Sequence, residues 1–583
     1  MRISPQRIAV FACLLLLSGG CQPDQPAAET IADPPTTTAP AGIAPVDSGP
    51  RIIEATSSTP QVDLYELFEL TVKLEAEFGN PYDQREVVLE AVFAGPDGAS
   101  MEVPGFWDGR ETWRVRFTPS EIGNWTYLLT VTDGRGASAP AQGAFEVVAS
   151  DRHGWLQVGS WVDPSYSPHY LAYHDGTPWY GRGHADLQMS LGGLEDDGFQ
   201  LFNEMPGSGE NYVMWWPMWA NNIMARSYDD YSVAQMELID LVLEDADAKG
   251  VTLAYTVWTH QHLRTNAHNW GRGKWLDNGF RHLTDLRGFF TDPEAWAWQE
   301  NFYRYTIARW GYSPAIAMWQ TITEIIGTES YAETDRWHEQ LNAYFQDNDP
   351  YRHPTTATQS GSVDWPSAHR LMDVPQMHVY EFVQDPIEAA QRMATWTRTM
   401  WDREEKPNWI GEYGEEGDQF YPELFHHSNW ASLAAGAAMT PIEWNDRHAY
   451  GRFTPEMGED MARFAAFVDQ IPLVTLNPVS IEVSSSDPAV RGWAVAGEEG
   501  GLIWVQDFSL QGSTIEEIRA DQSMLTPVEI AADGLSGAWS VIPYDTWAGA
   551  WLDPIEVDCS GDVPCLIPLP AFQSDLALRL TRP

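Results

Sequence analysis

Hydrophobic and polar residues follow two different periods along this chain. Between residues 51 and 150, and again between 476 and 583, short runs alternate apolar and polar residues between clusters rich in Gly, Pro, Asn and Asp. A strand that buries one face produces this alternation, and regular spacing of such strands is typical of a β-sandwich. The pattern predicts a β-sandwich at each end of the folded chain.

The central residues, 151–475, alternate between helical and strand-like patterns. Residues 232–250 place apolar side chains on one helical face and end at a glycine. The continuously apolar run 251–260 follows, as in a buried parallel strand. A second helix is predicted from Thr291, which is spaced from Glu294 as in a capping box. This order predicts parallel strands connected by helices.

Eight strand candidates with helical segments between most of them predict a (β/α)8 TIM barrel rather than an open doubly wound sheet. No Gly-rich phosphate loop follows any of them, which argues against a nucleotide cofactor, and no other cofactor is indicated. The candidates are residues 178–186, 212–219, 251–260, 315–324, 354–360, 374–380, 408–414 and 437–445.

The first fifty residues predict export. Arg2 and Arg7 precede an apolar run and the small residues that end at Cys21, which resembles a bacterial lipoprotein signal in which the cysteine is lipidated after cleavage. The run is too short for a permanent membrane span. Residues 21–50 are rich in Pro, Thr and Ala, as in an extended tether. We expect an outer-membrane, periplasmic or cell-surface lipoprotein that meets the membrane only through its lipid.

The charge and composition of the chain limit the classes of molecule that it is expected to bind. The 583 residues include 83 acids and 34 bases, and loss of the signal takes the net charge from -49 to -51. Such a surface repels nucleic acid and anionic lipid, so neither is an expected partner. The chain also contains 28 Trp, and an exposed indole face can stack on the apolar face of a sugar.

Two cysteines remain after the signal and the lipid site. Cys559 and Cys565 have five residues between them, which fits a small disulfide closing a hairpin in an oxidising compartment. A metal site there would need further ligands nearby, and the sequence offers none.

Two glutamates at strand ends carry the predicted chemistry. Catalytic side chains of a barrel gather at the carboxyl ends of its strands, and Glu324 and Glu412 end the fourth and seventh. Side chains from these opposite positions converge, and two facing carboxylates suit glycoside cleavage. We expect Glu324 to be protonated and Glu412 ionised. The expected substrate contacts are His184, Asp186, Trp215, His260, Arg264, Thr323, His378, Tyr380 and Trp444.

The stretches ending in these glutamates resemble clan A glycoside hydrolases. Residues 304–324 look like the segment before their acid/base, and 406–414 look like their nucleophile strand. Residues 175–180 and 430–445 are similar to cellulase-like and apiosidase-like bacterial members, in which an immunoglobulin-like domain often precedes the barrel and a β domain follows it. The resemblance implies this organisation: signal 1–20, tether 21–50, immunoglobulin-like β-sandwich 51–150, catalytic barrel 151–475 and C-terminal β-sandwich 476–583.

Carried over residue by residue, the resemblance makes Glu324 the acid/base and Glu412 the nucleophile of a retaining glycoside hydrolase. One position departs from the family, because Thr323 stands where Asn usually binds the sugar 2-hydroxyl. His378 and Tyr380 occupy the sixth-strand position where family members often place residues that touch the nucleophile. Tyr380 could therefore donate to Glu412, or pack as an ordinary core tyrosine.

A basic segment suggests the charge of the substrate. Residues 260–282 hold Arg264, Arg272, Lys274, Arg281 and four histidines against a single acid, Asp277. Arginine binds carboxylate and sulfate through paired hydrogen bonds, so a uronic or sulfated polysaccharide is one hypothesis. Pairing of these cations with acids elsewhere on the surface is the other.

Three alternatives remain open from the sequence. A metal-dependent hydrolase on the same barrel could use His184, Asp186, His260 and His262, with His378 and Asp446 further round. A non-catalytic surface lipoprotein that binds glycan would need neither glutamate. A lyase acting on uronic acids would use Tyr and His as base and acid. The chain has no GxSxG turn, which argues against a serine hydrolase.

Overall fold

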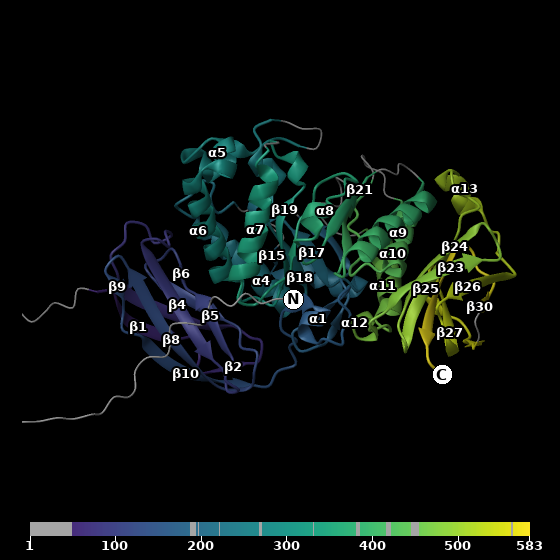
Figure 1. Ribbon diagram of the computed structural model, residues 1–583, viewed down its shortest axis with the longest axis horizontal. Coiled ribbons are helices and arrows are strands. Elements are labelled where there is room, and N and C mark those ends of the chain that lie inside the picture. The colour runs from purple at the N-terminus through teal and green to yellow at the C-terminus, as the bar shows by residue number, and fades with distance from the viewer. Residues whose placement is uncertain are drawn as a thin grey trace, which may run out of the picture. The chain divides into compact units, whose positions relative to one another are not determined.

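The computed structural model describes residues 49–583 with nine gaps, and the chain divides into the units 1–48 and 49–583. All that follows concerns the second unit, which contains several sheets and helices (Figure 1). The side chains of Asp186, Glu195 and Ala220 are not described. The gaps are residues 187–193, 196–197, 221, 267–270, 330–331, 381–384, 415–420, 445–453 and 561–563.

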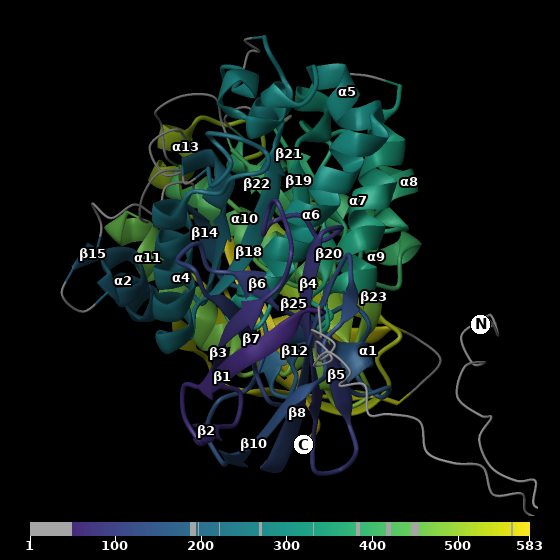
Figure 2. The same cartoon turned by 90° about the vertical axis from the view of Figure 1, so that its left-hand side faces the viewer.

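The N-terminal strands form two sheets, ordered β1-β3-β7-β6 and β2-β10-β8-β4-β5 with β9 on β8 (Figure 2). All pairs are antiparallel except β2 with β10. Alternate residues of β4 and β8 are buried, as the sequence pattern requires. The strands are β1 (Arg51–Ser57), β2 (Gln61–Asp63), β3 (Phe68–Glu75), β4 (Val87–Ala94), β5 (Ser100–Pro104), β6 (Phe106–Trp107), β7 (Trp113–Phe117), β8 (Gly123–Asp133), β9 (Gly136–Ala137) and β10 (Ala141–Val148).

Aromatic rings from both N-terminal sheets fill the space between them. Phe68 stacks on Phe145 with ring centroids 3.7 Å apart, and Phe93 stacks on Phe117 at 4.0 Å. Because Phe68 and Phe117 belong to one sheet and Phe93 and Phe145 to the other, the two sheets share one core.

The central strands run parallel, in a sheet ordered β14-β17-β18-β19-β20 and in the pair β21-β22. The N–H of Val374 donates to the carbonyl of Thr355 at 3.0 Å, and single parallel bridges join Tyr413 to Glu443 and Met439 to Gly181. The parallel strands are β14 (Gly183–Asp186), β17 (Tyr212–Trp215), β18 (Thr252–Thr259), β19 (Ile316–Thr323), β20 (Thr355–Thr356), β21 (Gln376–Val379) and β22 (Trp409–Tyr413).

Two smaller sheets accompany these strands. One joins β11, β12 and β13 in antiparallel order, and the other pairs β15 with β16. The strands are β11 (Leu156–Val158), β12 (Leu171–Tyr173), β13 (Pro178–Trp179), β15 (Leu194–Glu195) and β16 (Gly198–Phe199).

Helices connect most of the parallel strands. The principal ones are α2 (Gln200–Ser208), α4 (Val233–Ala248), α6 (Pro293–Trp310), α7 (Thr334–Asn348), α9 (Pro386–Arg403), α10 (Pro422–Ala435) and α11 (Pro455–Val468). The short ones are α1 (Gly159–Val162), α3 (Pro217–Ala220), α5 (Leu286–Thr291), α8 (Pro366–His369), α12 (Leu473–Leu476) and α13 (Ile515–Ala520), with 3-10 turns η2 (His260–Leu263), η3 (Trp275–Asp277), η4 (Gly279–His282) and η5 (Ile325–Gly327).

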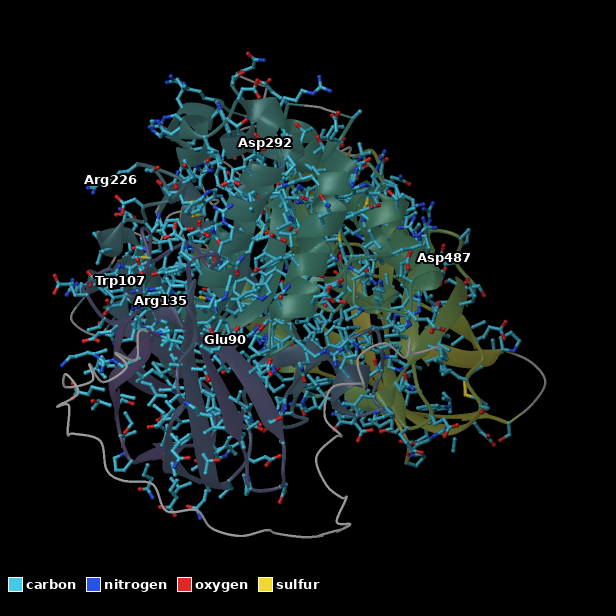
Figure 3. All side chains as sticks on the ribbon, turned by 60° about the vertical axis from the view of Figure 1, so that its left-hand side comes forward. Glu90, Trp107, Arg135, Arg226, Asp292 and Asp487 are labelled. Atoms are coloured by element: carbon cyan, nitrogen blue, oxygen red, sulfur yellow. A yellow bond between two sulfur atoms is a disulfide. The ribbon has the colours of Figure 1, made fainter. Side chains whose placement is uncertain are left out.

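The predicted capping box at Thr291 is wrong. The α6 N-cap is Asp292, labelled in Figure 3, whose side chain accepts from the N–H of Glu294 at 2.9 Å. Pro293 then occupies the first helical position, which its fixed φ favours. Thr291 instead ends α5, where its hydroxyl donates to the carbonyl of Arg287.

The C-terminal strands form one antiparallel sheet of nine, ordered β28-β27-β31-β25-β24-β23-β26-β30 with β29 on β27. β23 pairs with β24 through residues 479–481 and with β26 through residues 482–485, and the predicted C-terminal β-sandwich stays a prediction. A disulfide joins Cys559 to Cys565. The strands are β23 (Val479–Ser485), β24 (Val490–Ala496), β25 (Gly500–Asp507), β26 (Val528–Asp533), β27 (Gly537–Asp545), β28 (Ala550–Trp551), β29 (Ile555–Cys559), β30 (Cys565–Leu569) and β31 (Asp575–Thr581).

Within the part of the chain that the structure describes, none of the helices combines the length and the apolar character that crossing a bilayer requires. The predicted signal and Cys21 lie outside the described residues.

Candidate active site

Glu324 lies immediately after β19, in a backbone conformation that few residues other than glycine adopt. Its φ is 51° and its ψ 60°, in the left-handed region. The N–H of Glu324 donates to the hydroxyl of Thr358 at 2.8 Å, and its side chain is buried. Non-glycine residues in this region are uncommon and are held there by their surroundings. The turn therefore fixes where this carboxylate points.

Glu412 lies on β22, opposite His378 of the parallel strand β21. The preceding residue, Gly411, leaves room for this pairing, because a Cβ there would meet the Gln376 Oε1 at 1.8 Å and the His378 Cδ2 at 3.4 Å. Every residue of β22 is buried. A larger residue at 411 would displace the Gln376 amide.

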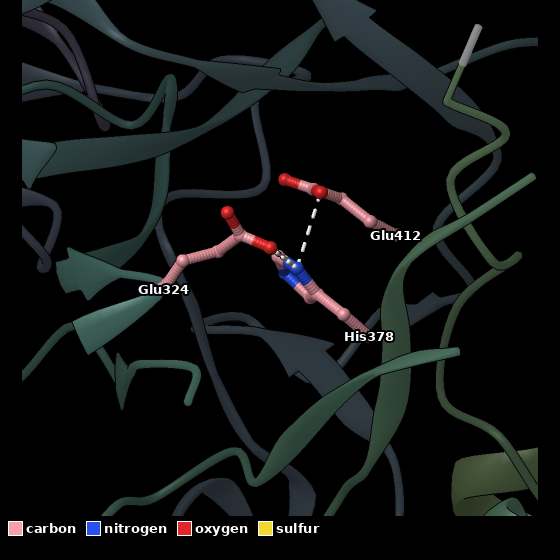
Figure 4. Close-up of side chains that lie close together, drawn as sticks. All are labelled: Glu324, His378 and Glu412. Atoms are coloured by element: carbon pink, nitrogen blue, oxygen red, sulfur yellow. Dashed lines mark hydrogen bonds and ion pairs between the residues drawn. The ribbon is translucent and has the colours of Figure 1, made fainter. Parts of the chain in front are cut away.

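The structure brings Glu324, His378 and Glu412 together (Figure 4). The His378 Nδ1 lies 3.0 Å from the Glu324 Oε1 and 3.1 Å from the Glu412 Oε2. Oxygen atoms of the two glutamates lie within 4.8 Å of each other. The Tyr380 hydroxyl donates to the Glu412 Oε2 at 2.8 Å. Side chains from three separate strand ends thus form one buried, hydrogen-bonded group.

The protonation preferences of the two glutamates are the reverse of the sequence expectation. Burial raises the pKa of Glu412, and the charge of Glu324 adds to this effect, so the pull of His378 is outweighed. Burial also acts to raise the pKa of Glu324, but hydrogen bonding to His378 and its charge overcome burial, and that pKa is lowered. The Ser360 hydroxyl, which donates to the Glu324 Oε1 at 3.0 Å, adds to this lowering.

His378 between the carboxylates is positively charged at neutral pH. Burial alone would lower the pKa of His378, but Glu412 and Glu324 together raise it to about 9. A cation between two buried carboxylates offsets the repulsion that would otherwise oppose their approach. His378 therefore allows two acids to share one small site.

His260 stands on the other side of Glu324. Its Nδ1 lies 3.7 Å from the Glu324 Oε2, and burial lowers the pKa of His260 to about 4, so the ring is neutral at pH 7. A Cβ at Gly327 would meet two carbons of this ring at 2.9 and 3.0 Å and the His260 Cβ at 3.1 Å. The glycine is therefore what permits His260 to approach the carboxylate.

The tryptophan beside the site is Trp216, not Trp215. Trp215 is fully buried in the core that contains Tyr255, 5.5 Å away between ring centroids. The next residue, Trp216, places its ring 6.3 Å from that of His260 and 5.4 Å from that of Trp444. Consecutive strand residues face opposite sides, so the parity of the strand was the signal that could have distinguished them.

The remaining residues predicted to contact the substrate have different surroundings. His184 is buried and bonds through Nδ1 to Glu210. The Thr323 hydroxyl is buried and has no hydrogen-bond partner among the described residues. Asp186 ends β14, but its side chain is outside the description, as are Asn445 and Asp446.

Two cations of the basic segment, residues 260–282, are held by contacts within the protein. Arg264 is fully buried and donates to the carbonyls of Gly327 at 3.0 Å and Gly271 at 2.8 Å. Lys274 lies over the Trp219 ring, 3.7 Å from its centroid, and burial lowers the pKa of this lysine. These groups hold the segment in place, which removes most of the argument for an anionic substrate.

His262 and the two remaining arginines complete the basic segment. His262 bonds to the Thr259 hydroxyl at 2.8 Å, and burial lowers the pKa of His262 to about 3. Arg281 donates to the carbonyls of Ala225 and Asn278, whereas Arg272 is exposed. His268 is outside the described residues.

The metal ligands predicted from the sequence do not gather among the described residues. His184 bonds Glu210 and His262 bonds Thr259, so neither imidazole joins a cluster of ligands. The described group with metal-ligand spacing is Glu324, His378 and Glu412 themselves. Two carboxylates and an imidazole are a donor set that zinc accepts. The same atoms already satisfy one another by hydrogen bonds.

Comparison with known families gives a match over part of the chain. A family model described as a domain of unknown function, DUF5060, matches residues 61–132, which run from β2 into β8. A search of curated proteins found no match.

Solved structures resemble this chain over most of its length. A crystal structure from Bacteroides vulgatus ATCC 8482, described provisionally as a glycoside hydrolase, is 17% identical, with a TM-score of 0.61 over 90% of this chain and 100% of that one. A family 5 glycoside hydrolase from the same organism is 12% identical, with a TM-score of 0.46 over 73% and 95%. A family 39 glycoside hydrolase from Bacteroides cellulosilyticus WH2 is 10% identical, with a TM-score of 0.42 over 90% and 99%. At these identities the first similarity establishes a shared fold, and we draw nothing from the other two.

Proposed function

We propose that this protein is a retaining glycoside hydrolase that uses Glu324 and Glu412. The observation that supports this most directly is the separation of their carboxylates, whose oxygens lie within 4.8 Å. Direct displacement at an anomeric carbon needs carboxyl groups about 5 Å apart, whereas an inverting enzyme leaves several ångströms more for a water molecule. Burial of both groups also suits a site that excludes bulk water.

In the proposed reaction Glu412 attacks the anomeric carbon while Glu324 gives its proton to the departing glycosidic oxygen. The bond from that carbon to the leaving oxygen breaks as the bond to Glu412 forms. Glu324 then takes a proton from water, the resulting hydroxide displaces Glu412, and the anomeric configuration is retained. Tyr380 donates to the Glu412 Oε2 and so fixes the direction of attack.

The proposed domain architecture is the one expected of such a glycoside hydrolase. We infer that the parallel strands and residues 439–443 belong to a (β/α)8 barrel over 151–475, flanked by an immunoglobulin-like domain over 51–150 and a β domain over 476–583. The hydrogen bond from Val374 to Thr355 and the two single bridges support this. We further propose that residues 21–50 tether the protein to a membrane through a lipid on Cys21.

Neutralising either glutamate tests the reaction. We expect E412Q to release no product from any polysaccharide that the wild type cleaves, and E324Q to lose about 10²- to 10⁴-fold in kcat on substrates with poor leaving groups. The matched control is E423Q, because Glu423 is buried and bonds Arg519 on α13, away from the site.

The polysaccharides offered as substrates should include neutral, uronic and sulfated polymers. Glycan release by E412Q equal to that of the wild type would contradict the proposal, and binding without release by the wild type would favour a glycan-binding protein.

Azide decides which glutamate is the nucleophile. The resemblance assigns that role to Glu412, whereas the pKa directions of the two carboxyl groups favour an ionised Glu324. If Glu412 is the nucleophile, E412A with azide yields a glycosyl azide of inverted configuration, and E324A with azide yields one of retained configuration. The opposite pair of products would exchange the two roles.

A metal-dependent hydrolase is the second candidate, because the same three residues have metal-ligand spacing. Dialysis against a chelator distinguishes a metal-dependent hydrolase from a glycoside hydrolase that uses the two glutamates. Loss of glycan release, with recovery on adding zinc, would favour the metal, and unchanged release would favour double displacement.

A further inference from the structure

The segment from Thr358 to Ser362, which follows β20, contacts both halves of the candidate site. At its start, the Thr358 hydroxyl accepts from the N–H of Glu324 at 2.8 Å, and the Thr358 carbonyl accepts from the N–H of Ile325 at 2.9 Å. These two bonds hold the left-handed turn in which Glu324 lies.

The rest of the segment reaches the side chain of Glu324 and the strand β21. The Ser360 hydroxyl donates to the Glu324 Oε1 at 3.0 Å. The N–H of Ser362 donates to the carbonyl of His378 at 2.6 Å, and the Ser362 hydroxyl accepts from the N–H of Tyr380 at 3.1 Å. Three of the five residues, Thr358, Ser360 and Ser362, therefore bond to Glu324, to His378 of β21 or to Tyr380 just after it.

The backbone of this segment is held in conformations that short loops rarely adopt. Gly361 has a φ of 44° and Ser362 a φ of 56°, both left-handed, next to Ser360 at 156°. Such conformations persist only where surrounding contacts impose them, and they are common beside active sites. The two non-glycine residues of this stretch, Ser360 and Ser362, both bond to the site.

We propose that residues 358–362 are a positioning loop for Glu324, in which the Ser360 hydroxyl selects the oxygen that exchanges the proton. This inference rests on the proposed glycoside hydrolase function. Ser360 and His378 both donate to Oε1, each at 3.0 Å. A donor bound to Oε1 leaves Oε2 to carry the acid proton, and Oε2 faces the Nδ1 of the neutral His260 at 3.7 Å.

In this proposal the Ser360 hydroxyl fixes the orientation of the Glu324 carboxyl group. Without Ser360, rotation about the last bond of the Glu324 side chain can present either oxygen to the substrate, so the proton is correctly placed for a smaller fraction of the time. Proton transfer demands close geometry, and small misplacements reduce the rate strongly. The loss should therefore appear in steps that need the proton and not in substrate binding.

Three variants at this position separate the hydroxyl from the backbone. S360A and S360G both lack the hydroxyl, but glycine also relieves the backbone constraint, and S360T keeps the hydroxyl. The matched control is T328V: the buried Thr328 hydroxyl donates to the Ile325 carbonyl at 2.8 Å, on the turn after Glu324, without touching the carboxylate. Thermal midpoints check that each variant is folded.

Each variant should be assayed on two substrates with the same sugar, one with a dinitrophenyl leaving group and one with an alkyl leaving group. We expect S360A and S360G to lose roughly tenfold or more in kcat on the alkyl glycoside, with KM within about twofold, and little on the dinitrophenyl glycoside, which needs no acid to depart. S360T should recover most of the rate, and T328V should resemble the wild type. Equal losses on both substrates, or recovery in S360G, would overturn the proposal.

A second measurement is independent of activity. The side-chain carboxyl carbon of Glu324, labelled with ¹³C and assigned through E324Q, should change its chemical shift in S360A but not in T328V, because a hydrogen bond to that carboxyl is lost in the first only. An unchanged shift would overturn the positioning role even if the protein cleaved no glycan. A changed shift in a protein without hydrolase activity would uphold the loop geometry and reject the proposed function.

Discussion

At the scale of single residues, the candidate site depends on positions that have no side chain. Gly327 and Gly411 carry no chemistry, yet a Cβ at either would collide with a group of the site, His260 in one case and Gln376 in the other. Gly327 therefore sets how closely His260 approaches Glu324, and Gly411 leaves room for the Gln376 amide beside β22. Space at these two positions is as much a part of the site as the charged groups.

Gly327→Ala tests this. The added methyl would meet two ring carbons of His260 at 2.9 and 3.0 Å and its Cβ at 3.1 Å, so the His260 side chain must move. We expect kcat/KM for glycan cleavage to fall roughly ten- to a hundredfold, since displacements near 1 Å have effects of that order. The control is Gly207→Ala in α2, where a Cβ meets nothing within 4 Å. Wild-type kinetics in the first variant would show that the position of His260 does not matter.

At the scale of elements, buried charges join the N-terminal sheets to the central helices. Arg116 of β7 donates to the Asp240 Oδ1 of α4 at 2.9 Å and to the Arg309 carbonyl of α6 at 3.0 Å. Asp240 also accepts from the Arg309 side chain and from Trp310 at 2.8 Å. Burial acts to raise the pKa of Asp240, but the two arginines outweigh it and the pKa is lowered. Three elements thus converge on one ionised carboxylate.

Asp240→Asn should destabilise the protein strongly. It keeps the shape of the side chain but removes the carboxylate that pairs with the buried Arg309 and Arg116, of which Arg116 keeps Glu69. Removal of one partner of a buried pair typically costs about 3 to 5 kcal/mol. Denaturant unfolding followed by fluorescence measures the change. Lys73→Gln breaks an exposed pair with Glu54 and should have no measurable effect. Equal stability of the two variants would mean that the buried cluster contributes nothing.

At the scale of the whole molecule, a buried histidine connects the C-terminal sheet to the helices of the central part. His426 of α10 bonds the Asp460 Oδ1 of α11 at 2.7 Å and the Asp575 Oδ2 of β31 at 3.2 Å. Trp504 and Trp547 also donate to Asp575, each at 2.8 Å. Both ring nitrogens of His426 face carboxylates, so the ring is bound as a cation that joins the two parts.

The stability of the protein should fall in alkaline solution because of this histidine. Burial alone would lower the pKa of His426, but Asp460 and Asp575 raise it to about 9, above the unfolded value of about 6.5. The contribution is therefore complete below pH 6.5, declines between 6.5 and 9, and is lost above 9; its full size is about 3 kcal/mol. Unfolding of the wild type and H426Q at pH 6 and pH 9.5 tests this.

We expect H426Q to be less stable than the wild type at pH 6 and to lose less stability between the two pH values, because it keeps only His378 of the two buried histidines whose pKa is about 9. The control is H153Q, since His153 lies in an exposed pair with Asp175 and should leave the pH dependence unchanged. Parallel curves for the wild type and H426Q would contradict the assignment.

The sequence by itself determined the local features that repeat along the chain. Alternating patterns fixed the terminal strands, continuous apolar runs fixed β18 and β19, and the ends of those runs pointed to Glu324 and Glu412. These features are readable because the 2-residue and 3.6-residue periods depend only on nearby residues.

Tertiary structure alone decided what those residues do. His378 and Ser360 approach Glu324 from segments 36 and more residues away, and their donors reverse the expected protonation order of the two glutamates. The hydrogen bonds from Arg264 to the carbonyls of Gly327 and Gly271 likewise could not be read from the sequence. A pKa and the accessibility of a charge depend on everything within a few ångströms, and residues distant in sequence supply most of that environment.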